Sequence, residues 1–349
     1  MDIVDALINT RREPLDVSRW ESLWIRLYDG RVSSGEAIAV MTSLSTALPD
    51  PDTLLAFVTS LRRRRVGYGT SAPVAAANIV GTGGGPSTFN ISTATAFVAA
   101  AMGVPVLKSG SRAYSSQCGS IDLLSELGVP LTRTPEETLE TLHRSGIACA
   151  GYYVYPPELT LLAKAILPMP MRTLGRFLNL LGPFLADLPA TAQLTGVSDR
   201  SSLAALRHIA AADDRRIWLV TNERGADELL SIARSDIFPN DGSMTLQVDP
   251  AQLGLAPGRL SDLAPCADKA DRIRHFEALL TGDASPVALD TICLNVAALA
   301  CLHETTPDWP CAIAEARRTI GRGHAAALLR TLRREHSDRV TASRIMAHV

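Results

Sequence analysis

The chain has 349 residues, which is enough for one large α/β unit or for two domains that share a cleft. Hydrophobic residues make up 46% and aromatic residues only 5%, so the core must consist mainly of Ala, Leu, Val and Ile. The net charge of −2 excludes the domain-wide positive field that binding to nucleic acid or to a membrane surface requires. We therefore expect neither of these partners.

Targeting signals and oxidising conditions are not indicated. The first residues, MDIVDALINTRREP, contain early acids and no long apolar stretch, and no apolar run approaches the ~18 residues of a membrane span. The six cysteines are scattered, without CxxC or metal-finger spacing. A cytoplasmic location is expected.

Residues 1–64 are predicted to be helical. Leu23 with Leu27 and Trp24 with Tyr28 recur at helical spacing, and SSGE resembles a cap before EAIAVMTSL. The segment DPDTLLAFVTSLRRRR opens with acids and closes with Arg62–Arg65, a polarity that complements the helix dipole. We interpret the four arginines as a solvated helix end, with a nucleic-acid patch as the alternative.

From about residue 74 the pattern alternates between strands and helices. It predicts a strand in VAAANIV, a helix in TATAFVAAAMG, a strand in VPVLK, helices in SSQCGSIDLLSELG and from Pro135 to Ser145, and a strand in GIACAGYYV. The helical stretch PPELTLLAKAILPMPMRTLGRFLNLLGPF interrupts this order. Strands then resume with RRIWLVT and SMTLQV, and helices follow from about residue 267. Such alternation is typical of a mostly parallel sheet with helices on both faces.

The expected fold class is α/β, with a small N-terminal all-helical domain packed on a larger α/β domain whose central sheet is mostly parallel and flanked by helices. The helical domain is expected to span residues 1–70, with 160–188 packing on it. The α/β domain is expected to combine 74–159 with 189–349, and a cleft should separate the two.

A glycine-rich segment, GTGGGPSTFNIST (residues 81–93), carries the most specific chemical signal. A buried strand enters glycines, whose backbone N–H groups can turn toward an anion without a side chain in the way. Ser92 and Thr93 then begin a helix whose free N–H groups and dipole favour negative charge. The segment has neither Walker nor GxGxxG spacing. We predict an anion site, with a plain tight turn as the alternative.

Two further segments offer groups that would complement this loop. The segment KSGSRAYSSQCGS (residues 108–120) leaves a predicted strand with Lys108, a guanidinium and several hydroxyls, which are donors suited to a pyrophosphate. In NERGADE, the adjacent Asp227 and Glu228 follow the strand IWLVT and could hold Mg²⁺ through oxygen ligands. The alternatives are a polar loop with a salt-bridged lysine, and ordinary first-turn acids of a helix DELLSIAR.

In this order and spacing, the segments resemble the anthranilate phosphoribosyltransferase family, which is related to the pyrimidine nucleoside phosphorylases. The resemblance spans nearly the whole chain, from VSSGEAIAVM through FLNLLGPFL and GADE to ALDTICLNVAALA. It implies a small helical domain, an α/β domain and a homodimer formed through the helical one. It also implies transfer of a phosphoribosyl group from phosphoribosyl pyrophosphate (PRPP), with Mg²⁺ as cofactor, to an aromatic amine.

Carried over position by position, the resemblance assigns three sets of residues. Mg²⁺ would be organised by Ser92, Asp227 and Glu228. The acceptor would lie near Gly81, Ser109, Ser111 and Arg172. PRPP would contact Gly81, Thr82, Gly84, Gly85, Thr88, Asn90, Ile91, Ser92, Thr93, Lys108, Ser116 and Ser120.

The chain departs from the family pattern mainly where the acceptor binds. The family's Gly-Thr-Gly-Gly-Asp-Gly is one residue longer and has Asp-Gly where this chain has Gly85-Pro86, and its Lys-His-Gly-Asn-Arg is here KSGSR. The family arginine that holds the carboxylate of anthranilate is replaced by Met169 or Met171, depending on the alignment, with Arg172 one position off the second. A carboxylate thus loses its bidentate partner.

From these departures we infer a diverged member whose acceptor is not anthranilate. Three alternatives stay open: a genuine anthranilate enzyme in which Arg172 replaces the missing arginine, a phosphorylase-like activity, and a catalytically silent relative that binds nucleic acid. The last is disfavoured by the charge of −2.

Overall fold

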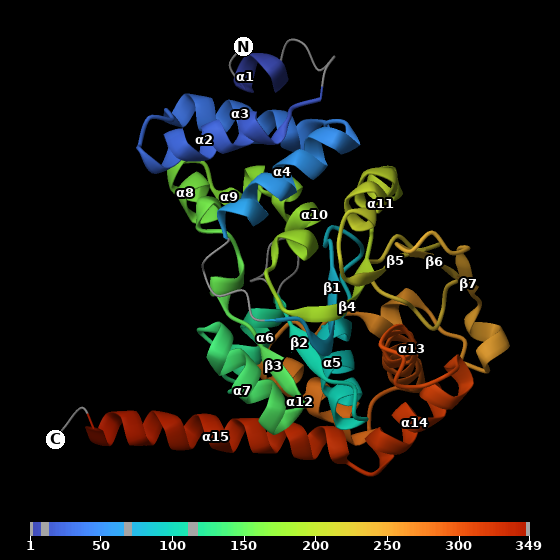
Figure 1. Ribbon diagram of the computed structural model, residues 1–349. Helices are drawn as coiled ribbons and strands as arrows, with labels where there is room; N and C mark the ends of the chain where they lie inside the picture. Colours follow the sequence, from blue (N-terminus) through green and yellow to red (C-terminus); the bar gives the residue numbers. More distant parts are fainter. Residues whose placement is uncertain (1–2, 8–13, 66–71, 111–117, 347–349) are drawn as a thin grey trace.

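The computed structural model describes residues 3–7, 14–65, 72–110 and 118–346, without the side chains of Arg172 and of residues 338–346. N-terminal helices stack on an α/β part with a seven-stranded, mostly parallel sheet (Figure 1). The expected fold class is therefore confirmed.

The N-terminal helices begin at side-chain caps. Asp16, Ser33 and Asp50 each accept a backbone N–H three residues ahead, and each such cap stabilises a helix by about 1 kcal/mol. Their apolar faces meet around the fully buried rings of Trp20 and Trp24. These helices are α1 (Ile3–Asp5), α2 (Val17–Tyr28), α3 (Ser34–Thr46) and α4 (Pro51–Arg64).

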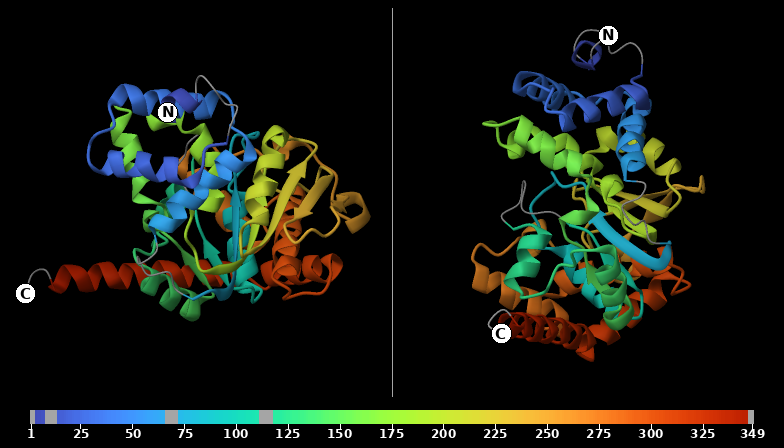
Figure 2. Two further views of the ribbon diagram at one scale, coloured as in Figure 1. Left: turned by 45° about the horizontal axis from the view of Figure 1, so that its top comes forward. Right: turned by 60° about the vertical axis from the view of Figure 1, so that its left-hand side comes forward.

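A second helical segment, α8 (Pro157–Ala165), α9 (Met171–Leu174) and α10 (Arg176–Leu185), packs against the N-terminal helices. Phe57 of α4 meets Phe177 of α10 edge to face, with ring centroids 5.1 Å apart. Figure 2 shows this segment between the N-terminal helices and the sheet. One continuous core therefore joins two stretches that are about a hundred residues apart in the sequence.

The sheet has the order β3-β2-β1-β4-β5-β6-β7. Strands β3, β2, β1, β4 and β5 are parallel to their neighbours, and β6 and β7 extend the sheet in antiparallel fashion. Because the parallel strands end at the same edge, the loops that follow them gather there. The strands are β1 (Val74–Gly81), β2 (Val106–Lys108), β3 (Ile147–Cys149), β4 (Ala190–Gly196), β5 (Arg216–Asn222), β6 (Ser235–Pro239) and β7 (Leu246–Val248).

Helices cover both faces of the sheet. One face packs against a core to which α5, α12, α13, α14 and α15 contribute, and the other meets α10 and α11. In Figures 1 and 2, α15 runs under the α/β part and projects beyond it. The remaining helices are α5 (Ile91–Ala101), α6 (Ser120–Glu126), α7 (Pro135–Ser145), α11 (Leu203–Ala211), α12 (Lys269–Thr281), α13 (Pro286–Leu302), α14 (Trp309–Gly321) and α15 (His324–Met346).

Strand β4 lies at the centre of the sheet, although its sequence, ATAQLTG, did not lead us to expect a strand. Its polar side chains are buried and paired. Gln193 accepts from Asn78 Nδ2 at 3.1 Å and donates to Pro183 O at 3.1 Å and to Thr195 Oγ1 at 3.0 Å. Buried polar groups are tolerated when they are bonded in this way, and such pairing is invisible in a hydrophobicity pattern.

The helix expected in DELLSIAR is wrong, because residues 227–234 form an irregular segment leading into β6. The side chain of Asn222 donates to Ala226 O at 2.9 Å and Glu228 O at 2.7 Å, while Asn295 of α13 binds both the N–H and the C=O of Leu229. These side chains satisfy backbone groups that a helix would otherwise pair.

The interpretation of Arg62–Arg65 as a solvated helix end is also wrong for three of the four residues. Arg62 donates to Phe184 O and to Asp213, Arg64 to Glu158 at 2.6 Å, and Arg65 to Asp187 at 3.1 Å. Only the Arg63 side chain is largely exposed, at 64%. The run therefore fastens α4 to the connections between the helices and the sheet.

Among the described residues, no single helix is long and apolar enough to cross a membrane. Helices α12 and α13 meet that criterion only as a pair, and they are bent by 66° relative to each other.

Candidate active site

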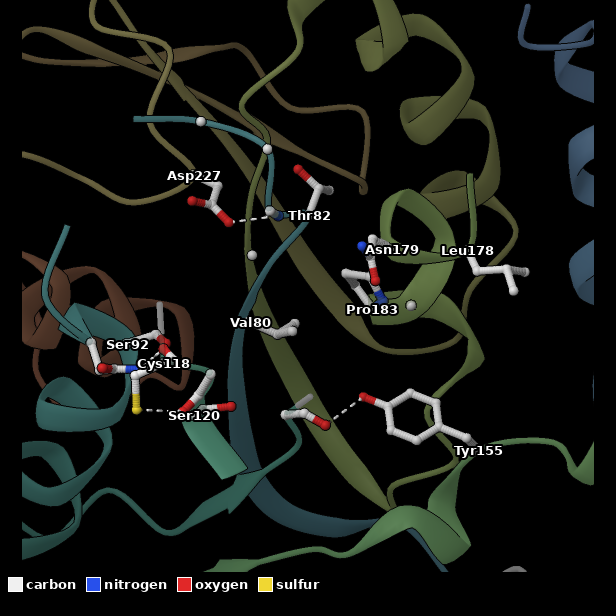
Figure 3. Close-up of a pocket in the computed structure, with 18 of the residues that line it drawn as sticks. Val80, Thr82, Ser92, Cys118, Ser120, Tyr155, Leu178, Asn179, Pro183 and Asp227 are labelled. Atoms are coloured by element: carbon white, nitrogen blue, oxygen red, sulfur yellow. Dashed lines mark hydrogen bonds between the residues drawn. The ribbon is translucent and has the colours of Figure 1, made fainter. Parts of the chain in front are cut away.

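A cavity of about 520 Å³ opens where the parallel strands end and the second helical segment approaches them (Figure 3). The glycine-rich loop, the start of α5, residues 118–120 and the 227–228 pair line one side, and α8, α9 and α10 line the other. We refer to these sides as the loop side and the helix side. Most residues assigned from the sequence thus meet in one place. The described PRPP and metal candidates on its wall are Gly81, Thr82, Gly84, Gly85, Thr88, Asn90, Ser92, Ser120, Asp227 and Glu228.

The glycine-rich loop needs its glycines for two different reasons. Gly83 and Gly84 have φ of +68° and +85°, a backbone region that other residues adopt at a cost. A Cβ on Gly85 would lie 2.5 Å from Gly225 O, so the loop packs directly against the backbone before Asp227. The family's aspartate could not stand at Gly85 without moving one of these segments.

Asp227 is inserted into the loop. Its Oδ2 accepts the N–H of Gly83 at 2.7 Å, and a Cβ on Gly81 would lie 2.0 Å from the same oxygen (Figure 3). On the other side, a Cβ on Gly196 would lie 1.7 Å from the backbone oxygen of Asp227. Two glycines therefore make room for one carboxylate, which occupies a loop N–H that a phosphate oxygen could also bind.

The neighbouring Glu228 has a different environment. Its Oε2 is buried and has no hydrogen-bond partner among the described residues. Burial, and then the adjacent Asp227, raise the pKa of Glu228 well above its usual value, and burial also raises the pKa of Asp227. Two carboxyls that resist ionisation side by side form a site that a cation would stabilise.

Magnesium fits this donor set. Mg²⁺ prefers carboxylate oxygens and usually combines one or two of them with waters and substrate phosphates. No group of three or more His, Cys, Asp or Glu side chains that could hold a metal occurs in the part of the chain that the structure describes. The pair would therefore hold the ion jointly with water and a phosphate, with the nearby Ser92 also on the cavity wall.

Helix α5 directs its start toward the cavity, since Asn90 and Ser92 lie on the wall. Ile91 and Thr93 point the other way and are fully buried, and Thr93 Oγ1 has no partner among the described residues. The alternation follows from helical geometry. Of the four consecutive residues assigned to PRPP, two can reach a ligand with their side chains.

Lys108 lies beneath the cavity and not on its wall. Its side chain is buried, and Nζ donates to Ser109 O at 2.8 Å. Burial lowers the pKa of Lys108 to about 8, against the opposing effect of nearby acidic groups that include Glu228 and Asp227. The ammonium thus lies close enough to the carboxylate pair to interact with it electrostatically.

The residues assigned to the acceptor are only partly brought together. Ser109 turns into the sheet, where its N–H donates to Asn78 Oδ1 at 3.2 Å and its Oγ accepts from Asn78 Nδ2 at 3.0 Å. Ser111, like the PRPP candidate Ser116, lies outside the described residues, as does the side chain of Arg172. Gly81 is on the cavity wall.

Tyr155 fixes the loop that follows Ser109. Its hydroxyl donates to Gly110 O at 3.2 Å (Figure 3), and burial raises its pKa to about 12, so the donor proton is retained. A Cβ on Gly110 would lie 2.1 Å from Ser120 Oγ, so this glycine allows the start of α6 to approach closely. The sequence gave no reason to select Tyr155.

The helix side was not foreseen from the sequence. Its wall is largely apolar, with Thr160 and Asn179 as polar side chains, and no cationic side chain lies on it among the described residues. The spacing of three and four residues along α8 and α10 is the signal that could have revealed this wall once its direction was known. The wall consists of Tyr152, Tyr155, Pro156, Leu159, Thr160, Ala163, Met171, Leu178, Asn179, Gly182 and Pro183.

Similarity to known proteins agrees with this architecture. The Glycosyl transferase family, a/b domain, matches residues 74–326, so the chain is a glycosyltransferase in its fold and in its class of site. An anthranilate phosphoribosyltransferase of Lactiplantibacillus plantarum is 30% identical over 328 residues, which cover 93% of this chain and 94% of that protein. The chain belongs to the anthranilate phosphoribosyltransferase family.

Solved structures show the same fold. The anthranilate phosphoribosyltransferase of Thermus thermophilus superposes with a TM-score of 0.79 at 28% identity, covering 97% of this chain and all of that one. The Saccharomyces cerevisiae enzyme, solved in complex with PRPP and Mg, superposes with a TM-score of 0.66 at 22% identity, covering 95% of this chain and all of that one.

Proposed function

We propose that the protein transfers the phosphoribosyl group of PRPP, in a Mg²⁺-dependent reaction, to an aromatic nitrogen acceptor other than anthranilate. The observation that carries the proposal is the contrast between the two sides of the cavity. The loop side combines glycine N–H groups with the Asp227–Glu228 pair, whereas the helix side has no described cation to hold an acceptor carboxylate.

The loop side is suited to the donor substrate. The acceptor nitrogen would form a bond to C1 of the ribose while the bond from C1 to the pyrophosphate oxygen breaks, and the nitrogen would lose a proton. Charge builds on the departing pyrophosphate, which the loop N–H groups and the helix α5 dipole would stabilise. Mg²⁺ held by Asp227 and Glu228 would neutralise part of that charge. No covalent nucleophile is required.

The helix side disfavours an anionic acceptor. Moving a carboxylate from water to an apolar wall is costly without a paired charge, and the nearest described charges, Asp227 and Glu228, are also negative. A neutral aromatic acceptor avoids this cost. Anthranilate itself is the alternative, favoured by the names of the relatives, and it requires the Arg172 guanidinium to enter the cavity.

Calorimetric titration of PRPP, with and without Mg²⁺, tests the donor half. We expect Mg²⁺-dependent binding to the wild type and a loss of at least about 100-fold, ~3 kcal/mol, in the Asp227→Ala/Glu228→Ala variant. Equal affinity with and without the metal would contradict the proposed metal site.

Turnover of anthranilate tests the acceptor half independently. Micromolar KM for anthranilate, lost in Arg172→Ala, would establish the alternative acceptor. Weak or absent turnover together with intact PRPP binding supports a different acceptor.

We also infer the boundaries and assembly expected from the resemblance. The shared core of α4 and α10 supports a helical domain of residues 1–70 with 160–188, placed on an α/β domain of 74–159 and 189–349. A homodimer through the helical domain is supported by the apolar side chains of Ile25 and Tyr28 on α2, which are 49% and 48% exposed. Sedimentation of Ile25→Asp would test the dimer.

A further inference from the structure

Helix α10 places one polar side chain in the apolar wall of the cavity. Phe177, Leu181 and Phe184 are at most 1% exposed and hold the opposite face of the helix in the core. Helical geometry then directs Asn179, together with Leu178, Gly182 and Pro183, toward the cavity. In Figure 3, the Asn179 side chain lies beside Pro183 and faces the strand that carries Val80 and Thr82.

The hydrogen-bonding capacity of Asn179 is unused. Its carboxamide makes no hydrogen bond to any residue that the structure describes, although it is partly buried. Its backbone carbonyl also lacks the usual donor four residues ahead, because Pro183 has no N–H. One residue therefore presents an amide donor and two oxygen acceptors at the cavity wall.

The position of this residue is fixed from behind. Gln193 Nε2 donates to Pro183 O at 3.1 Å, and Gln193 Oε1 accepts from Arg215 Nη1 at 2.7 Å. These bonds tie α10 to strand β4 at the centre of the sheet. A wall residue on an element held in this way is preorganised, which is what selective recognition requires.

We propose that Asn179 determines acceptor specificity by pairing with a neutral edge that carries both an N–H donor and a C=O acceptor, such as a carboxamide or a lactam. This inference rests on the proposed function and narrows its acceptor class. Such an edge satisfies the carboxamide in both directions. A carboxylate of the same shape only accepts, so it leaves the oxygens of Asn179 unpaired and carries a charge that the wall does not compensate.

The test compares two aromatic probes of nearly equal shape, 2-aminobenzamide and anthranilate. Each is titrated calorimetrically into protein saturated with Mg²⁺ and pyrophosphate. We expect the amide to bind at least about tenfold more tightly, ~1.4 kcal/mol. In Asn179→Leu, which keeps the volume but removes the hydrogen bonds, we expect this preference to fall to near one.

Two further variants separate recognition from general damage. Asn179→Asp keeps the shape and should weaken anthranilate further while retaining most affinity for the amide. Gln252→Leu makes the same kind of change at an exposed amide outside the cavity and should leave the preference intact. Unchanged thermal midpoints in all variants show that each one is folded.

Three outcomes overturn the inference: equal affinity for the two probes in the wild type, a preference that survives Asn179→Leu, or no binding of either probe. These differ from failure of the proposed function, which appears as absent PRPP binding or as micromolar KM for anthranilate. The preference between the probes is measured with pyrophosphate and does not depend on turnover.

Discussion

The two sides of the cavity are built in different ways. The loop side comes almost entirely from backbone and from two carboxylates, and its dimensions depend on glycines at which a Cβ would overlap a neighbour by more than an ångström. The helix side comes from side chains on α8, α9 and α10, held in place by a separate core. A backbone site tolerates few substitutions, whereas a side-chain wall can change its chemistry without changing its frame. This difference explains how a family can keep one substrate while altering the other.

Gly81→Ala should break the loop side with the largest effect. The added methyl would meet Asp227 Oδ2 at 2.0 Å, so either the carboxylate or the loop must move. We expect PRPP affinity in the presence of Mg²⁺ to fall by about 100-fold, ~3 kcal/mol, as measured by calorimetry. The control is Gly35→Ala in α3, where no atom lies within 4 Å of the new Cβ. Wild-type affinity in Gly81→Ala would show that the carboxylate does not need this contact.

Arg64→Met should loosen the frame of the helix side. Glu158 opens α8, is 2% exposed, and pairs with Arg64 at 2.6 Å. Removing the partner leaves a buried carboxylate uncompensated, so we expect a loss of about 2 kcal/mol in the free energy of unfolding by denaturant titration. The neighbouring Arg63→Met should change it by less than about 0.5 kcal/mol, because Arg63 is exposed and lies 3.9 Å from Glu21. Equal effects would mean that the pair does not hold α8.

Lys108 should give the smallest of these effects and sharpen the electrostatics of the loop side. Because burial lowers its pKa to about 8, Lys108 is mostly charged at pH 7 and mostly neutral at pH 9. We expect PRPP affinity to fall by about fivefold over this interval, ~1 kcal/mol. The decrease should be absent in Lys108→Met. The same pH dependence in both proteins would assign it to the ligand or to another group.

Much of the fold and of the loop side could be predicted from the sequence. The strand VAAANIV, the small-residue helix after NIST and the helix Pro135–Ser145 depend on local periodicity and local caps, and the structure contains them as β1, α5 and α7. The glycine-rich segment was informative because a backbone anion site is contiguous in the chain. Its partners Asp227 and Glu228 were visible because they directly follow a strand of the parallel sheet.

Other features depended on residues far apart in the sequence. Strand β4 was missed because its polar residues pair only inside the sheet, through Asn78 and Arg215. The helix expected at 227–234 was wrong because Asn222 and Asn295 supply competing hydrogen bonds. The arginine run was misinterpreted because its acceptors lie on α8 and beyond α10.

The sequence by itself determined the family, the alternation of strands and helices, and the chemistry of the loop side. Each of these is encoded in short stretches whose backbone conformation follows from local residue types. Tertiary structure alone decided the helix side, where Tyr155 and Asn179 come together with the glycine-rich loop, and it turned Ser109 away from the cavity. The physical reason is that side-chain direction depends on packing against distant elements, which local sequence patterns do not specify.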